Sequence, residues 1–182
     1  KRLSVFRFET PTQSEFSLII PKKAISEIQK LFFDKIEIYY DDTTLIAQSA
    51  NFEFFTKLIN GRFPDYNRVI PQEIKRRLRL RRDKMIEGIK TVSIISESTK
   101  IVFAPQTISF ESIVEDNSEA KTTIEFATGL EEEIYVGVKN RYLLDFLQSI
   151  EEEHFEFGFN DSNLAFTVSS NELKTVIMPI NL

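Results

Sequence analysis

The chain has 182 residues, enough for one large or two small domains. Hydrophobic residues make up 42% of it and charged residues 28%, the ordinary balance of a globular protein, and the lack of cysteine excludes disulfides and thiolate metal sites. Because the sequence contains neither an apolar run of about 18 residues nor a signal-peptide pattern, we expect a cytoplasmic protein.

The charge is unevenly distributed along the chain. The formal net charge is −5, yet the segment 75–84, KRRLRLRRDK, holds seven basic residues and one acid, so the remainder carries a formal −11. Such segregation can steer a polyanion to one face of a protein whose other surfaces stay acidic. A solvated basic strand followed by a helix start accounts for the same run, and the sequence leaves both interpretations open.

The first third of the chain predicts short strands around one amphipathic helix. Residues 22–32 place their apolar side chains on one helical face and their lysines on the other. The segment 58–71, LINGRFPDYNRVIP, is interrupted by one glycine and two prolines and is typical of a linker between domains. The strand candidates are residues 1–8, 16–20, 35–40, 44–49 and 53–59.

The rest of the chain repeats this order of elements. Helices are predicted over 82–96 and 140–150. At an offset of 119 residues, Ile25 matches Leu144 and Asp42 matches Asp161 in character, so one supersecondary unit is used again. The predicted strands are 77–80, 100–104, 107–113, 122–128, 133–138, 154–159, 164–169 and 172–179.

A unit of one strand, one helix and three strands therefore occurs three times, the middle copy being the loosest. Two copies make a domain of about 110 residues. Residues 72–182 hold two copies of the unit, whereas residues 1–71 hold only one. Within residues 1–71, residues 1–8 would be the last strand of a further copy that is missing. We therefore expect the chain to begin in mid-domain and to be a piece of a longer protein.

The segment LINGRFPDYNRVIP, together with VIMPINL at the end of the chain, resembles the β sliding clamp family, the processivity subunit of bacterial DNA polymerase III. The resemblance covers all 182 residues and includes KRLSVFRF, IIPKK and YLLDFL. It implies an α+β DNA-clamp fold, in which repeated strand–helix–three-strand units turn their helices inward around a hole and their antiparallel sheets outward. Residues 1–71 would be the C-terminal half of the clamp middle domain plus a linker, and residues 72–182 the clamp C-terminal domain.

The resemblance also implies a function without catalysis. A clamp of this family is a ring of two subunits that encircles duplex DNA without sequence specificity and needs no cofactor or metal. It tethers the replicative polymerase, the clamp loader and repair proteins through short hydrophobic peptides. We expect a cytoplasmic, nucleoid-associated processivity factor, and we expect that this chain alone does not close a ring.

The peptide-binding residues implied by the resemblance come from distant parts of the chain. Apolar walls, an adaptable methionine, and arginines whose stems pack while their heads form hydrogen bonds all suit a peptide pocket. Carried over by position, the pocket residues are Arg2, Leu3, Pro64, Arg68, Val69, Tyr142, Ala165, Val176, Met178 and Pro179. Without the resemblance, Val176 and Met178 are better explained as core residues of an edge strand.

Two positions depart from the family pattern. Members of the family often have asparagine where Lys139 stands, whereas in this chain the asparagine is Asn140. Lys1 takes the place of a small polar residue or histidine. We therefore expect the rim of the pocket to differ from that of other members.

Basic residues cluster at or near the starts of the three expected helices. Helix N-termini carry partial positive charge and free N–H groups that favour phosphate, and basic side chains on inward helices would accept the backbone of any DNA sequence. A solvated surface explains any one of these residues, but basic residues at all three starts favour DNA contact. The residues are Lys22, Lys23, Arg81, Arg82, Lys84, Lys139 and Arg141.

Ile94 and Ile95 fall off the apolar stripe of the helix predicted over 82–96. Apolar residues on a polar helix face indicate a partner surface, and a frayed helix end is the alternative. The resemblance implies that this region meets the first domain of the neighbouring subunit, so both isoleucines are predicted ring-interface residues.

Two other functions remain open at the level of sequence. A β-rich adaptor could bind peptides without encircling DNA, in which case the basic helix starts would face bulk solvent or pair with acids. Asp41, Asp42 and Asp161 could support metal-dependent nuclease chemistry, although each lies in a predicted hairpin turn, where aspartate is favoured for local hydrogen bonds. The acidic run 151–153 with His154 is predicted to be a solvated loop.

Overall fold

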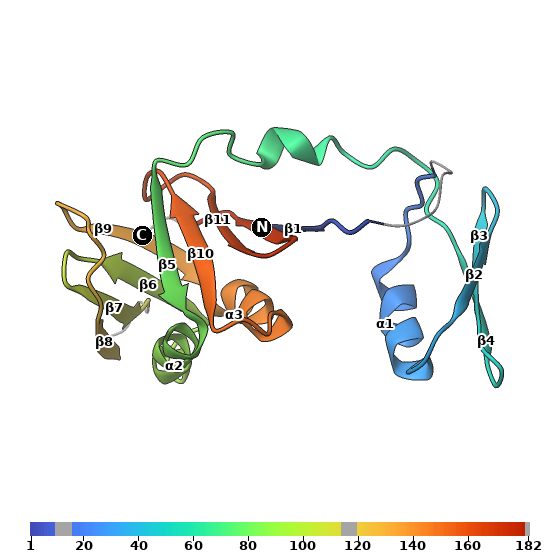
Figure 1. Ribbon diagram of the computed structural model, residues 1–182, viewed down its shortest axis with the longest axis horizontal. Coiled ribbons are helices and arrows are strands. Elements are labelled where there is room, and N and C mark those ends of the chain that lie inside the picture. Colours follow the sequence, from blue (N-terminus) through green and yellow to red (C-terminus); the bar gives the residue numbers. More distant parts are fainter. Residues whose placement is uncertain (10–15, 114–119, 181–182) are drawn as a thin grey trace. The chain divides into compact units, whose positions relative to one another are not determined.

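The computed structural model describes residues 1–9, 16–113 and 120–180, so the last two residues of the VIMPINL motif, Asn181 and Leu182, lie outside it. The chain divides into two compact units (Figure 1). We call residues Thr10–Asp65 the small unit, and residues Lys1–Glu9 together with Tyr66–Leu182 the large unit.

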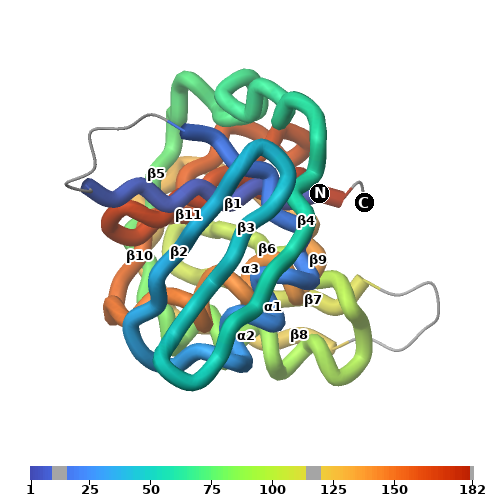
Figure 2. The backbone as a smooth tube through the Cα atoms, turned by 90° about the vertical axis from the view of Figure 1, so that its right-hand side faces the viewer, coloured from blue at the N-terminus to red at the C-terminus, as the bar shows by residue number. Residues whose placement is uncertain are grey.

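The small unit is one helix against one antiparallel sheet of strand order β2-β3-β4. Leu45 and Ala47 of β3 are buried together with Ala24 of the helix, so the helix covers that face of the sheet. Figure 2 looks onto the opposite face, with the helix behind the strands. The elements are α1 (Lys22–Leu31), β2 (Glu37–Tyr40), β3 (Thr44–Gln48) and β4 (Glu53–Lys57).

The turn between β2 and β3 is closed by one aspartate. Asp41 Oδ1 accepts hydrogen bonds from the backbone N–H groups of Thr43 and Thr44, at 2.7 and 2.8 Å, which is the local bonding that makes aspartate favourable in turns. The strand predicted over 16–20 is not formed. Within the described part of the chain, this segment makes one backbone hydrogen bond to a strand-bearing region, from Ile59 N to Ile19 O at 2.9 Å, and it pairs with no strand.

In its described residues, the large unit contains two α-helices, one short 3₁₀ helix and two antiparallel sheets. Its strands are β1 (Arg2–Phe6), β5 (Arg76–Arg81), β6 (Ser98–Phe103), β7 (Thr107–Ser112), β8 (Lys121–Glu125), β9 (Ile134–Lys139), β10 (His154–Phe159), β11 (Phe166–Ser170) and β12 (Leu173–Ile177). Its helices are α2 (Arg82–Ser93), α3 (Asn140–Ser149) and the short 3₁₀ helix η1 (Tyr66–Val69). The predicted helices 82–96 and 140–150 are confirmed, with α2 ending three residues earlier than predicted.

The two repeats of the large unit exchange their first strands. One sheet has the order β1-β12-β11-β10-β5 and the other β8-β7-β6-β9, so β5 joins the strands of the second repeat and β9 those of the first. Matching backbone bonds mark the two crossings, from Arg82 N to Glu153 O at 2.8 Å and from Asn140 N to Glu97 O at 2.9 Å. This exchange ties the repeats into one folding unit.

Both sheets turn buried phenylalanines into a shared core. Phe103 of β6 lies 5.2 Å, ring centre to ring centre, from Phe159 of β10, and Phe157 stacks on Phe166 at 4.9 Å. All four rings are fully buried, and aromatic pairs of this kind add to the stabilisation from area burial. The core joins the two sheets that the exchanged strands complete.

Strand β1 forms one edge of the five-stranded sheet of the large unit. It pairs with β12 in antiparallel register from Arg2–Ile177 to Phe6–Leu173.

The assignment of residues 1–71 and 72–182 to two clamp domains stays a prediction. Among the described residues, no helix is long and apolar enough to cross a membrane.

Candidate functional site

The sheet face that points away from α3, which we call the outer face, carries part of the predicted peptide site. Leu3 is opposite Val176 across β1 and β12, and Val176 is opposite Thr167 across β12 and β11. Residues opposite one another share a face of a sheet, so these three side chains form a row. The sequence prediction contained Leu3 and Val176 but missed Thr167, which strand alternation places beside them.

Val176 and Met178 differ in exposure. Val176 is 4% exposed, whereas Met178, one step beyond the end of β12, is 45% exposed. The backbone N–H of Met178 donates to the carbonyl of Lys1 at 3.0 Å, which continues the β1–β12 pairing to this residue. Val176 is therefore buried, as the core-residue alternative expects, although β12 lies between β1 and β11 rather than at a sheet edge. Met178 is exposed, and its side chain is open to a partner.

Segment 66–74, which contains η1, lies over part of the outer face. One side-chain carbon of Ile74, Cγ2, would lie 2.9 Å from a Cβ placed on Gly158, so Ile74 packs directly on β10. A cavity of about 480 Å³ is lined by residues of this segment, β1 and β12, among them Asn67, Ile70, Val5 and Lys174. The predicted pocket residues Arg68 and Val69 belong to η1, and Val69 is exposed.

Arg2 and Tyr142 lie on the helix-facing side of the sheet rather than with Leu3. The Arg2 guanidinium donates to Asp145 Oδ2 at 2.7 Å and to the Tyr142 carbonyl at 3.3 Å, and it lies 5.5 Å from the centre of the Tyr142 ring. Strand alternation explains this, because Arg2 and Leu3 are neighbours in β1 and must point to opposite faces. The structure therefore divides the predicted set between two faces.

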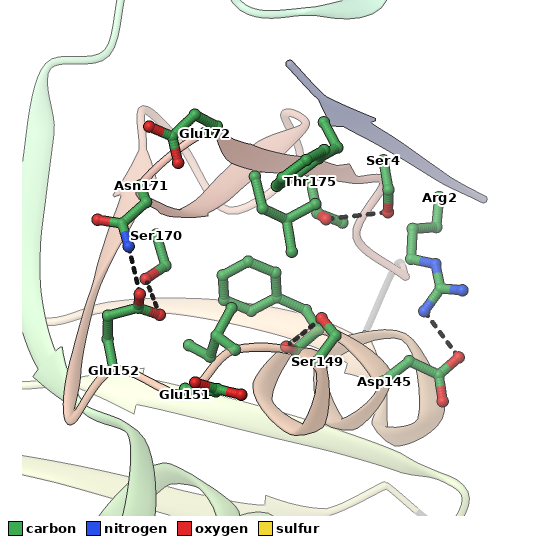
Figure 3. Close-up of a pocket in the computed structure, with 14 residues that line it drawn as sticks. Arg2, Ser4, Asp145, Ser149, Glu151, Glu152, Ser170, Asn171, Glu172 and Thr175 are labelled. Atoms are coloured by element: carbon green, nitrogen blue, oxygen red, sulfur yellow. Dashed lines mark hydrogen bonds and ion pairs between the residues drawn. The ribbon is translucent and has the colours of Figure 1, made fainter. Parts of the chain in front are cut away.

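A cavity of about 560 Å³ opens between β1, β12 and α3 (Figure 3). Arg2 is the one member of the predicted pocket that lines it within the described part of the chain. Ser4 and Thr175, whose hydroxyls lie 2.9 Å apart, form its upper wall, and Glu152 accepts hydrogen bonds from Ser170 and Asn171 across from them. The sequence prediction missed these polar residues, although the alternation in β1 and β12 assigns Ser4 and Thr175 to the face of Arg2.

The remaining predicted pocket residues are distributed as follows. Ala165 lies directly before β11, and Pro179 follows Met178; both are half-buried in the large unit. Pro64 belongs to the small unit and is exposed. The large unit thus contains nine of the ten predicted pocket residues, namely Arg2, Leu3, Arg68, Val69, Tyr142, Ala165, Val176, Met178 and Pro179.

The basic helix starts of the large unit lie at opposite ends of an antiparallel helix pair. Arg82, at the start of α2, donates from Nε to the carbonyl of Leu147, near the end of α3, at 2.6 Å. Asn140, at the start of α3, donates from its side chain to the carbonyl of Ser96, just beyond α2, at 2.8 Å. Arg82 is therefore half-buried and occupied in joining the helices, whereas Lys139 is exposed.

Carboxylates offset several of the predicted DNA-facing charges. Arg81 pairs with Asp83 at 2.6 Å; this hydrogen bond raises the pKa of Arg81 and lowers that of Asp83. Lys84 pairs with Glu87 at 3.0 Å and Arg141 approaches Asp145 at 3.9 Å. Lys22 and Lys23 are exposed at the start of α1 in the small unit.

The basic run at 75–84 does not form one continuous positive face. Arg77, Arg79 and Arg81 point to one side of β5, while the side chain between each pair is a buried leucine. Glu156, on the neighbouring strand, forms an ion pair with Arg77. The sequence run thus becomes a stripe of alternating arginines with acids beside it.

Ile94 and Ile95 follow the last residue of α2 and are both exposed, Ile94 by 83%. Just beyond the helix, the N–H of Ile95 donates to the carbonyl of Val92, three residues back, at 3.1 Å, which is a turn bond rather than a continued α-helical ladder. They therefore occupy a turn rather than a polar helix face. Their role at a ring interface stays a prediction.

Asn140 has a structural role at the position next to Lys139. It is buried, and its side-chain oxygen accepts a hydrogen bond from Thr99 Oγ1 at 2.7 Å. Since its amide nitrogen is also bonded, to Ser96, both ends of the side chain are satisfied. Asn140 is therefore unavailable to a partner peptide, and Lys139 is the exposed residue at this corner.

The acidic residues considered for nuclease chemistry form no metal site in the described residues, which hold no group of three His, Cys, Asp or Glu side chains suited to a metal ion. Asp41 closes a turn in the small unit, and Asp161 lies in a turn of the large unit, where its carbonyl accepts from Leu164 N at 3.3 Å. The prediction of a loop at His154 is wrong, because His154 begins β10 and pairs with Arg81.

Comparison with known proteins places both parts of the chain in one family. Residues 67–181 match the model of the DNA polymerase III beta subunit, C-terminal domain, and residues 1–65 match the model of its central domain. A beta sliding clamp of Helicobacter pylori is 31% identical over 199 aligned positions, which cover 100% of this chain and 53% of that protein. The chain thus spans about half the length of the curated relatives it matches.

Solved structures of similar fold include two Helicobacter pylori beta clamps. One is bound to a DNA ligase peptide and superposes with a TM-score of 0.91 at 30% identity, covering 100% of this chain and 52% of that one. The other is in complex with diflunisal, with a TM-score of 0.92 at 30% identity and coverage of 100% and 53%. The mixture of helices and antiparallel sheets is therefore the clamp fold, and the chain belongs to the DNA polymerase III beta subunit family.

Proposed function

We propose that the protein containing this chain is a DNA polymerase processivity factor, a sliding clamp that encircles duplex DNA without sequence specificity. The observation that carries the proposal is that consecutive parts of the chain match the central and C-terminal domains of one clamp subunit. In this assignment, residues 1–71 contribute to the middle domain and its linker, and residues 72–182 form the C-terminal domain. The protein would act in the cytoplasm, at the nucleoid, and would carry out no catalysis.

The proposed partner site is centred on the outer face of the large unit. Met178 offers an exposed, adaptable apolar side chain beside Val176 and Leu3, and Arg68 and Val69 of η1 would form the opposite wall. A Helicobacter pylori clamp of the same fold binds a DNA ligase peptide. A replicative polymerase, a clamp loader and repair proteins would dock hydrophobic peptides at this site in the same way.

Met178→Ala tests the partner site. A fluorescein-labelled hydrophobic clamp-binding peptide, titrated with this chain and followed by fluorescence anisotropy, should bind the variant about tenfold more weakly, because loss of a central apolar anchor removes on the order of 1–2 kcal/mol. Arg68→Ala should also weaken binding. Leu164→Ala, at another exposed apolar residue of the large unit, is the matched control and should bind like the wild type. Equal affinity of all four proteins would contradict the proposed site.

The DNA-facing and ring-closing roles are proposals of the same kind. The exposed basic residues at the helix starts would contact DNA phosphates in the ring; they are Lys22, Lys23, Lys139 and Arg141. Arg81 and Lys84 would contribute when a DNA phosphate displaces their carboxylate partners, Asp83 and Glu87. Arg82 is held by α3 and would act through helix packing. Ile94 and Ile95 would meet a neighbouring subunit.

A further inference from the structure

The small unit exposes a row of three apolar side chains on the face of its sheet opposite α1. Tyr39 of β2 is opposite Ile46 of β3, and Ile46 is opposite Phe55 of β4, so the three lie side by side across the sheet. Tyr39 is 51% exposed and Phe55 is 70% exposed. We call these residues the apolar row. Figure 2 looks onto this face, where none of the labelled elements of the small unit lies in front of the strands.

The apolar row is not part of the core of the small unit. That core is formed on the other face, where Leu45 and Ala47 are buried with Ala24 of α1. Single exposed apolar residues are ordinary on protein surfaces, but contiguous ones are a mark of a binding surface. The aromatic rings at the two ends of this row, Tyr39 and Phe55, are each more than half exposed, so a partner that removes them from water would gain binding free energy.

Charged residues border the apolar row on both sides. Glu37 and Glu53 flank Gln48 in the adjacent row of the same face, and Lys57 lies opposite Thr44 in the row on the other side. Glu37 also accepts a hydrogen bond from the Tyr39 hydroxyl at 2.7 Å, which fixes that ring beside the carboxylate. The surface therefore combines an apolar strip with a negative strip alongside it.

We propose that this face binds an extended peptide segment of a partner protein in which an apolar residue stands two positions from a lysine or arginine. Neighbouring rows of a sheet face are separated by two residues of strand, about 6.7 Å. In an extended peptide laid along the strands, residues two apart have the same spacing and point to the same side. The apolar residue covers Phe55 and Ile46 while the basic residue reaches Glu37 and Glu53.

The size of the surface favours a peptide over a second copy of the chain. Three side chains and their borders amount to a few hundred Å², whereas a stable dimer buries about 800 Å² on each partner. A peptide that lies along two adjacent rows matches the smaller area. The apolar row shares no residue with the proposed clamp peptide site, which is built on residues of the large unit apart from Pro64.

A peptide array tests the proposal. Immobilised peptides Gly-Ser-Xaa-Ser-Zaa-Ser-Gly, covering every pair of residue types at Xaa and Zaa, are probed with the labelled chain. We expect binding to peptides with Leu, Ile, Phe, Tyr or Trp at one variable position and Lys or Arg at the other. Phe55→Ser should lose this pattern by tenfold or more in signal. Met178→Ala should retain it, because its site lies on the other unit.

A charge reversal keeps the test decisive if the serine variant misfolds. Glu37→Lys with Glu53→Lys should move the preference at the charged position from Lys and Arg to Asp and Glu. Either an unchanged pattern in both variants or equal binding of acidic and basic peptides to the wild type would overturn the proposal. A dimer in size-exclusion chromatography with light scattering that Phe55→Ser abolishes would assign the face to a second copy instead.

Discussion

At the scale of single residues, Gly88 shows how one missing atom permits the packing of the large unit. Gly88 lies inside α2, where glycine costs about 1 kcal/mol of helix propensity relative to alanine. The ring of Phe110 occupies the space beside it, since a Cβ on Gly88 would lie 2.4 Å from Phe110 Cε2. The stabilisation from packing α2 closely against Phe110 of β7 therefore outweighs the helix-propensity cost of the glycine.

Gly88→Ala should destabilise the protein. The added methyl group must displace the buried Phe110 ring, and overpacking of this kind costs about 1–3 kcal/mol, more than the gain in helix propensity. Urea unfolding followed by circular dichroism measures the change, with Lys90→Ala on the exposed side of α2 as the control. The double variant Gly88→Ala, Phe110→Leu should recover part of the loss. A single variant as stable as Lys90→Ala would contradict the packing argument.

At the scale of elements, a carboxylate links three strands of one sheet. Glu111 of β7 is opposite Lys100 of β6 and Lys121 of β8, with ion-pair distances of 3.2 and 2.7 Å. The hydrogen bond from Lys121, followed by that from Lys100, lowers the pKa of Glu111. Because β8 is an edge strand, these pairs help to hold it on the sheet.

Glu111→Gln should reduce stability at neutral pH and not at acidic pH. A carboxylate whose pKa is lower in the folded state contributes stability above its unfolded pKa of about 4.3 and loses it as the pH falls through the folded value. The difference from the wild type should be about 0.5–1 kcal/mol at pH about 7 and should vanish at pH about 2. Urea titrations at several pH values measure it, with Glu125→Gln on β8 as control. A difference independent of pH would rule out the ion pairs as its cause.

At the scale of the whole molecule, the proposed function depends on a closed ring rather than on affinity for DNA. Several of the basic residues near the helix starts of the large unit are ion-paired or bonded to backbone carbonyls. Such a surface binds phosphate weakly and with strong salt dependence. Retention on DNA would then come from topology, which salt does not weaken in the same way.

Loading the full-length protein onto nicked circular DNA tests this topological retention. After loading by its clamp loader, the protein should stay on the circle through a gel-filtration column at high salt and leave when a restriction enzyme linearises the DNA. Uncut circular DNA is the control. Retention on the linear form, or loss from the circle at high salt, would favour an electrostatic binder or a peptide-binding adaptor without DNA encirclement.

The sequence by itself determined most of the elements of this protein. The three main helices and the strands after residue 22 form close to where the 3.6- and 2-residue periodicities place them, because these patterns depend on neighbours along the chain. The prediction of a strand over 16–20 is wrong, because one backbone hydrogen bond between Ile59 and Ile19 does not form a strand ladder. The repeat and the family-specific segments were also readable from the sequence alone.

Only the tertiary structure decided which distant residues meet. The exchange of β5 and β9 between repeats, the pairing of β1 with β12, and the bond from Arg2 to Asp145 join residues far apart in sequence. The local periodicity of the sequence does not predict these pairings, because the strand partners are determined by which arrangement buries the apolar faces in a common core. For the same reason, the candidate pocket splits between two sheet faces, Asn140 is buried, and the basic run becomes a stripe of arginines with acids beside it.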